Sequence, residues 1–152
     1  MNVKVGSAPD SWGVWFAADP RQTPWERFLD EVAEAGYEWI ELGPYGYLPT
    51  DLQVLKDELG RRGLKASGTF LMAHLEDPEA WPGLESDLMG AGELLAGLGA
   101  QFVLLIDDLL FSGLVTHSVP RNPHKLIQYG LVGVHVGFMI FAIAPNEQCD
   151  GQ

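Results

Sequence analysis

The chain has 152 residues, enough for one domain with its own hydrophobic core. Its apolar fraction of 47% and its charged fraction of 20% are typical of a globular protein. A formal net charge of −12 argues against nucleic-acid binding, because no stripe of Lys and Arg offsets the acids. The one cysteine, Cys149, excludes an intrachain disulfide. It favours a reducing compartment, and we expect a cytoplasmic protein with no signal peptide.

The first predicted elements are a short strand over residues 3–8 and a helix that begins near residue 25. An aromatic loop joins them. Thr23 and Glu26 have the spacing of a capping box, and Pro24 suits the first helical position. Apolar residues then recur at helical spacing, and Gly36 ends the helix.

A second strand is predicted over residues 37–42, followed by a loop rich in glycine and tyrosine. Thr50 and Gln53 form a second candidate capping box, and leucines line the helix up to Gly63. This segment therefore repeats the strand and helix order of the first.

The third strand is predicted over residues 64–71, a long helix over residues 81–98 and a fourth strand over residues 102–106. The fourth strand is apolar without alternation, which is typical of a strand covered on both faces. No hairpin turn separates any pair of strands. The chain is therefore predicted to be α/β, with parallel strands joined by right-handed crossovers.

The character of the chain changes after residue 108. Residues 1–108 hold 19 of the 21 acids and 7 of the 9 bases, so they carry the whole net charge. Residues 109–152 are neutral overall and lose the alternation of strand and helix. We therefore divide the chain into a domain over residues 1–108 and an atypical apolar tail over residues 109–152.

The tail contains 19 residues, 126–144, without Asp, Glu, Lys or Arg. That length fits a membrane span, and Gly133 and Gly137 have the spacing of a helix-packing motif. Alternating valines favour one or two buried strands instead. A third reading is a tail that is not native sequence, such as a shifted reading frame. The abrupt loss of charge favours the third reading, and we expect no membrane association.

Polar and aromatic residues follow each of the four strands, where parallel α/β proteins carry their chemistry. The candidate substrate-binding residues are Trp12, Glu41, Tyr45, His74 and Asp107. Each also has a plain alternative. The aromatic residues could simply pack beneath loops, the acids could be solvated or cap turns, and the histidine could lie on the surface. Asp10 is expected to cap its own turn.

Two segments carry a resemblance to a known family. Residues 8–16, APDSWGVWF, and residues 36–50, GYEWIELGPYGYLPT, closely resemble inosose dehydratase and related sugar isomerases and epimerases. The resemblance extends over the first 108 residues. It implies a TIM barrel of the xylose-isomerase type, a (β/α)₈ fold of roughly 250 residues. This chain would hold only the N-terminal half, with about four strands.

The resemblance also implies an activity and a cofactor. The reaction would remove water from a keto-inositol, in inositol catabolism, by metal-assisted proton abstraction next to a carbonyl. The partner would be a small polyol or sugar, and the metal manganese or cobalt. In such barrels the metal ligands lie on strands five to eight. Residues 109–152 show none of that pattern, so we assign no metal ligand and no catalytic residue and expect no metal on this chain.

Two alternatives to an enzyme remain. A catalytically inactive half-barrel would expose strands one and four as edges and could pair with another copy, as a homo-oligomer with an assembly role. A carbohydrate-binding module would retain the aromatic loops without the metal.

Overall fold

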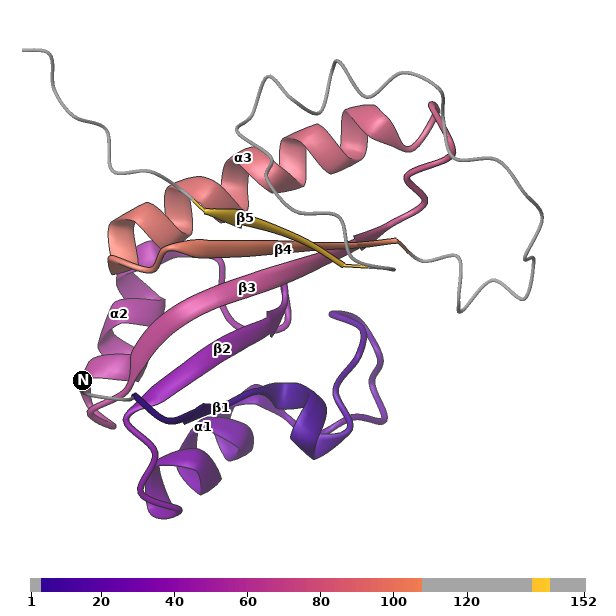
Figure 1. The fold of residues 1–152 in the computed structure, drawn as a ribbon. Helices are drawn as coiled ribbons and strands as arrows, with labels where there is room; N and C mark the ends of the chain where they lie inside the picture. Colours follow the sequence, from indigo (N-terminus) through magenta and orange to yellow (C-terminus); the bar gives the residue numbers. More distant parts are fainter. Residues whose placement is uncertain (1–3, 108–137, 143–152) are drawn as a thin grey trace, which may run out of the picture.

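The structure, a computed structural model, describes residues 4–107 and 138–142 (Figure 1). Strands and helices alternate along the first segment, as the sequence predicts. The elements are β1 (Gly6–Ser7), η1 (Pro9–Trp12), α1 (Trp25–Glu34), β2 (Trp39–Pro44), α2 (Leu52–Gly60), β3 (Lys65–Ala73), α3 (Trp81–Leu98), β4 (Phe102–Asp107) and β5 (Phe138–Ala142).

The strands form one sheet in the order β1-β2-β3-β4-β5. β1 to β4 are all parallel, with Gly6 paired to Trp39, Trp39 to Lys65 and Gly68 to Phe102. A helix follows β1, β2 and β3 in turn, so each parallel pair is joined by a crossover. This arrangement confirms the predicted α/β class with a parallel four-stranded sheet.

β5 corrects one expectation about the sheet edges. It pairs antiparallel with β4, Phe138 opposite Ile106 and Ala142 opposite Phe102. The prediction that strand four is an exposed edge is therefore wrong, whereas β1 does lie at an edge. β5 also gives strand conformation to part of the apolar stretch in the tail. The rest of that stretch, and the boundary predicted at residue 108, lie outside the described residues.

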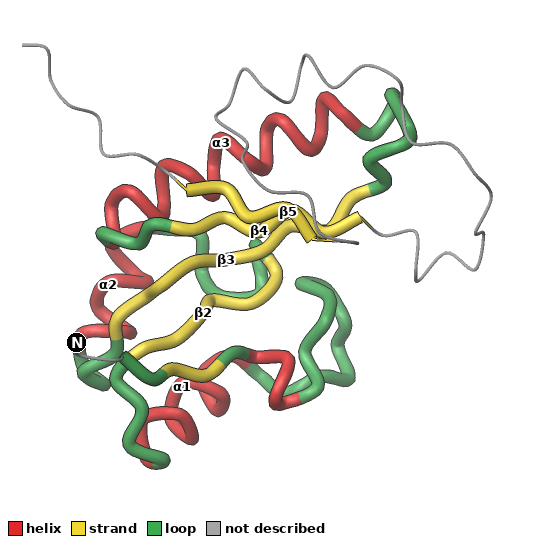
Figure 2. Tube along the Cα trace, viewed as in Figure 1, coloured by secondary structure: helices red, strands yellow, loops and turns green. Residues whose placement is uncertain are grey.

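The two faces of the sheet differ. Figure 2 shows α1, α2 and α3 along one side, where they form the hydrophobic core with the sheet. Ile40 and Leu42 of β2 point into this core and are 0% and 3% exposed. Burial of such side chains stabilises the fold by about 1.5–3 kcal/mol each. Because side chains alternate along a strand, Trp39 and Glu41 belong to the opposite, inner face. Over the described residues no helix is long and apolar enough to cross a membrane.

Both predicted capping boxes are wrong in detail. α1 begins after Pro24 without a side-chain cap, and the Thr23 hydroxyl instead donates to the Trp12 carbonyl at 3.5 Å. At α2 the cap is Asp51, whose carboxylate accepts from the Val54 amide at 2.9 Å. Asp is as good an N-cap as Thr, so the sequence at 50–51 allowed either residue.

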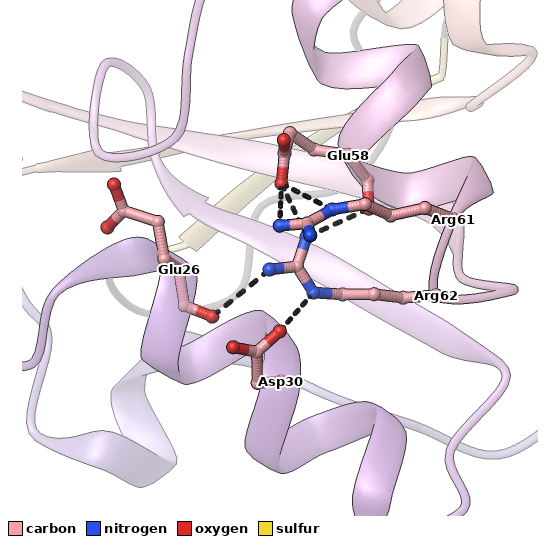
Figure 3. Close-up of polar contacts among 5 residues, drawn as sticks. All are labelled: Glu26, Asp30, Glu58, Arg61 and Arg62. Atoms are coloured by element: carbon pink, nitrogen blue, oxygen red, sulfur yellow. Dashed lines mark hydrogen bonds and ion pairs between the residues drawn. The ribbon is translucent and has the colours of Figure 1, made fainter.

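A cluster of charged residues joins α1 to the end of α2 (Figure 3). The Arg62 side chain is 6% exposed. Its Nε lies 2.6 Å from Asp30 Oδ1, and its Nη1 lies 2.6 Å from Glu58 Oε2. Its Nη2 donates to the Glu26 carbonyl at 3.4 Å. Arg61 binds the same Glu58 carboxylate at 2.6 Å but is 57% exposed. Arg62 therefore fastens the two helices together, whereas Arg61 adds a contact at the surface.

Candidate functional site

The inner face of the sheet contains an open hollow of about 830 Å³. It is lined by residues of β1, η1, β2, β3 and β4 and of the adjoining loops, among them Lys4, Asp10, Trp39, Glu41 and Phe102. Among the helices α1 to α3, none supplies a lining residue. The hollow is therefore built by the strands and by the loops at their ends.

Glu41 carries the most perturbed carboxyl group of this hollow. Burial in the sheet raises its pKa from 4.5 to about 8, and the negative charge of Asp10 adds to that rise. The Gly43 amide, which donates to Glu41 Oε1 at 3.1 Å, acts in the opposite direction. Burial prevails, so the carboxyl group is mostly protonated at neutral pH. It can donate or accept a proton there.

An irregularity in β2 holds this carboxyl group in place. The register between β2 and β3 shifts on either side of Glu41, and Gly43 has φ +79°. A Cβ at Gly43 would lie 2.6 Å from Pro9 Cγ, so only glycine fits. The bulge turns the Gly43 amide back toward Glu41 and packs β2 against η1.

Two lysines lie near Trp39, which lines the hollow: Lys4 also lines it, and Lys65 is paired with Trp39 across β2 and β3. Lys4 Nζ lies 4.1 Å and Lys65 Nζ 5.7 Å from the centre of the Trp39 ring. Both ammonium groups are near enough for a cation–π interaction. Asp10 lines the hollow on the side of η1, where its Oδ1 accepts from the Ser11 amide at 2.8 Å. The sequence did not predict this pair of lysines. Lys4 and Lys65 are 61 positions apart, and they come together only because both lie over the Trp39 ring of β2.

A second cavity of about 380 Å³ lies at the carboxyl ends of β2 and β3. Tyr45 and His74 both line it, together with Trp15 and Phe16 of the loop after η1. The structure thus brings two of the predicted site residues together. His74 Nδ1 lies 3.3 Å from Glu76 Oε1.

The Tyr45 hydroxyl is directed at α3. A Cβ at Gly90 of that helix would lie only 2.5 Å from it. Burial raises the pKa of Tyr45, and the nearby charges of Asp87 and Glu93 raise it further. The ring packs against the core, so this hydroxyl is held by the helix rather than presented to the inner face.

Trp12 is turned toward α1. Its indole Nε1 donates to Glu31 Oε2 at 2.6 Å. Its ring meets Phe28 edge-on, with centroids 5.0 Å apart and planes at 80°. Trp12 lines neither cavity. Its contacts match the packing alternative that the sequence left open.

Asp107 ends β4 and also lines neither cavity. Val103 and Leu105, at the same strand parity, are 3% and 1% exposed in the core, so alternation places Asp107 on the helix side. Its Oδ1 is buried and has no hydrogen-bond partner among the described residues. The five candidate residues therefore do not share one cavity. Glu41 faces the inner hollow, whereas His74 faces the second cavity.

The described residues do not fit the divalent metal that the resemblance implies. Over residues 4–107 and 138–142 no group of three His, Cys, Asp or Glu could hold a metal ion. Among the described residues, Asp10 and Glu41 are the two carboxylates that line the inner hollow, fewer than a manganese or cobalt site uses. No chemical step is therefore assigned to a metal here.

Comparisons with known proteins give structural likeness only. No protein-family model and no curated protein sequence matches the chain. The structure is similar to a xylose isomerase domain protein from Alicyclobacillus acidocaldarius subsp. acidocaldarius, with 24% identity and a TM-score of 0.45 over 64% of this chain and 34% of that one. It is also similar to D-psicose 3-epimerase, crystallised in the presence of D-fructose, with 13% identity and a TM-score of 0.49 over 79% and 42%. The chain therefore spans less than half the length of either protein.

Proposed function

We propose that this chain is the N-terminal half of a xylose-isomerase-like barrel that acts on a keto-polyol or sugar. More specifically, we propose an enzyme of the inosose dehydratase type. Residues 8–16 and 36–50 support this family, and the parallel sheet with an intervening helix after each strand is consistent with a half-barrel. We assign the metal of such an enzyme to the strands that would follow in a complete barrel.

The observation that carries the proposal is the buried carboxyl group of Glu41 in the lining of the inner hollow. A group with a pKa of about 8 is present in both protonation states near neutral pH, as a general acid or base must be. Both polar and aromatic side chains line the hollow, among them Asp10, Trp39 and Phe102, which suits a ring that carries hydroxyl groups. The role proposed for Glu41 is to move a proton at the carbon next to the substrate carbonyl, or at the departing hydroxyl.

Solvent deuterium exchange tests this role without requiring the complete reaction. The full chain would be incubated in D₂O with a keto-inositol or with D-fructose, with and without Mn²⁺. Proton NMR would follow the signal next to the carbonyl. General acid–base groups contribute about 10²- to 10⁴-fold to such steps, so Glu41→Gln should slow exchange at least about 100-fold.

The matched control is Glu38→Gln, the same substitution at an exposed site just before β2. This variant should exchange at the wild-type rate. The proposal is wrong if the wild-type chain exchanges no faster than buffer in every condition, or if Glu41→Gln exchanges as fast as Glu38→Gln.

A carbohydrate-binding half-barrel without catalysis is the second candidate. The second cavity favours it, because Trp15 and Phe16 are 46% and 43% exposed there beside His74. Exposed aromatic rings are suited to the apolar face of a sugar. This candidate predicts that keto-inositol quenches the tryptophan fluorescence of the wild-type chain and that Trp15→Ala abolishes the quenching. Such quenching without any deuterium exchange would support this candidate over the enzyme.

A further inference from the structure

β3 contains a buried hydroxyl group that the proposed chemistry does not use. Thr69 is 1% exposed and pairs with Val103 of β4, a residue of the hydrophobic core. A valine at position 69 would fill nearly the same space without burying a hydroxyl group. Burial of a hydroxyl group is costly unless the group makes a hydrogen bond. The partner of the Thr69 hydroxyl therefore indicates what this side chain does.

That partner is the backbone of the bulge in β2. The Thr69 hydroxyl donates to the Gly43 carbonyl at 2.7 Å. On the other side of Glu41, the Ser67 hydroxyl donates to the Ile40 carbonyl at 3.0 Å. The register between β2 and β3 shifts on both sides of Glu41, and a bulge of this kind interrupts the ladder of backbone hydrogen bonds. Two hydroxyl groups of β3 thus bind the backbone of β2 on either side of Glu41.

The glycine that Thr69 binds is also the one that binds the carboxyl group. The Gly43 amide donates to Glu41 Oε1 at 3.1 Å, which leaves Oε2 to carry the proton of the neutral form. Glycine has the widest backbone freedom of any residue, and Gly43 is held at φ +79°. The Thr69 hydroxyl on its carbonyl and the Pro9 ring beside its Cα limit that freedom. The direction of the Gly43 amide therefore depends on Thr69.

We propose that Thr69 is a positioning residue, whose hydroxyl holds Gly43 so that the Gly43 amide keeps the Glu41 carboxyl group directed into the hollow. This inference rests on the proposed role of Glu41 in proton transfer. Thr69 itself lines neither cavity. It therefore acts on the reaction only through Gly43 and Glu41.

Loss of the Thr69 hydroxyl should raise the pKa of Glu41 further. The hydrogen bond from the Gly43 amide stabilises the ionised carboxylate and so lowers this pKa, against the effect of burial. Without Thr69 the amide is held less firmly, and its effect on the pKa weakens. Asp10 of η1 faces Glu41 and Lys4 lines the same hollow, and neither is altered. The residue of β3 that pairs with Glu41 is an uncharged glycine.

Carbon-13 NMR of the glutamate carboxyl groups measures this effect on the full chain without a substrate. The Glu41 signal is assigned by its absence from Glu41→Gln. In Thr69→Val the midpoint of its titration should move to higher pH by at least about 0.5. Thr69→Ser retains the hydroxyl and should keep the wild-type midpoint. Thr50→Val, the same substitution at an exposed position before α2, should also leave the midpoint unchanged.

A purely structural role for Thr69 predicts a different result. Leu55→Ala in α2 removes a side chain that is 0% exposed and does not touch Gly43. It should lower the free energy of unfolding in urea and leave the Glu41 midpoint unchanged. If circular dichroism shows that Thr69→Val is unfolded, Thr69→Cys retains a weaker donor, and its midpoint should move in the same direction. A wild-type midpoint in either folded variant, or an equal shift in Leu55→Ala, overturns the proposal.

Solvent deuterium exchange separates this inference from the proposed function. If Glu41 moves the proton, the pH profile of exchange in Thr69→Val should shift together with the Glu41 midpoint, and Thr69→Ser should show the wild-type profile. A shifted midpoint in Thr69→Val, with no exchange by the wild-type chain, would overturn the proposed function and support the contact from Thr69 to Glu41. Exchange by the wild-type chain whose pH profile is unchanged in Thr69→Val would overturn the positioning role.

Discussion

Replacing Glu41 by Gln should stabilise the protein, and increasingly so as the pH rises. The unfolded carboxyl group ionises near its ordinary value of 4.5, whereas the folded group retains its proton up to about pH 8. Between these values the folded state binds more protons than the unfolded state, so the wild-type chain loses stability as pH rises. A glutamine at position 41 can still accept from the Gly43 amide, but it does not ionise.

The size of the effect follows from the two pKa values. Each pH unit between 4.5 and about 8 costs the wild-type chain about 1.4 kcal/mol. The full interval gives an upper bound of about 5 kcal/mol. The open hollow leaves the carboxyl group partly solvated, which screens the penalty, so we expect about 2 kcal/mol in favour of Glu41→Gln above pH 8.

Urea denaturation followed by tryptophan fluorescence measures this difference. The free energy of unfolding of the variant minus that of wild type should be near zero at about pH 4.5. It should rise steadily to about pH 8 and then level off. Glu38→Gln, at an exposed position, should show no such slope. A difference that stays flat from about pH 5 to about pH 9 would refute the assignment of a buried, protonated Glu41.

Further predictions concern two matched pairs of substitutions, each measured by the free energy of unfolding in urea. Gly90→Ala places a Cβ 2.5 Å from the Tyr45 hydroxyl and should destabilise the protein by about 1–3 kcal/mol. Gly92→Ala in the same helix meets open space and should stabilise it by up to about 1 kcal/mol. Equal effects would contradict the close packing of Tyr45 on α3. Arg62→Ala should cost about 2–3 kcal/mol, because this 6% exposed guanidinium joins two helices. Arg61→Ala should cost less than about 1 kcal/mol, and a larger loss there than at Arg62 would contradict the role given to Arg62.

The sequence by itself determined the order of the elements and the direction of the strands. The unbroken apolar run at 102–106 predicted a strand covered on both faces, and the lack of hairpin turns predicted parallel pairing. β4 lies in that segment and β1 to β4 are parallel, but Phe102 is 42% exposed, so the prediction that both faces of this strand are covered is wrong. These features are local, since the period of apolar residues and the length of a connection are written in consecutive positions. Glu41 was likewise predicted as a candidate site residue from a local feature, its position at the end of a predicted strand.

Only the tertiary structure decided which way each strand-end residue faces and what it meets. The raised pKa of Glu41 comes from burial by neighbouring strands and from Asp10, 31 positions away in the chain. Trp12 packs on α1 because its indole donates a hydrogen bond to Glu31 and its ring contacts the Phe28 ring. Tyr45 lies on α3 because Gly90 leaves it room. Each of these contacts joins residues at least 16 positions apart, and no local pattern encodes such a partner.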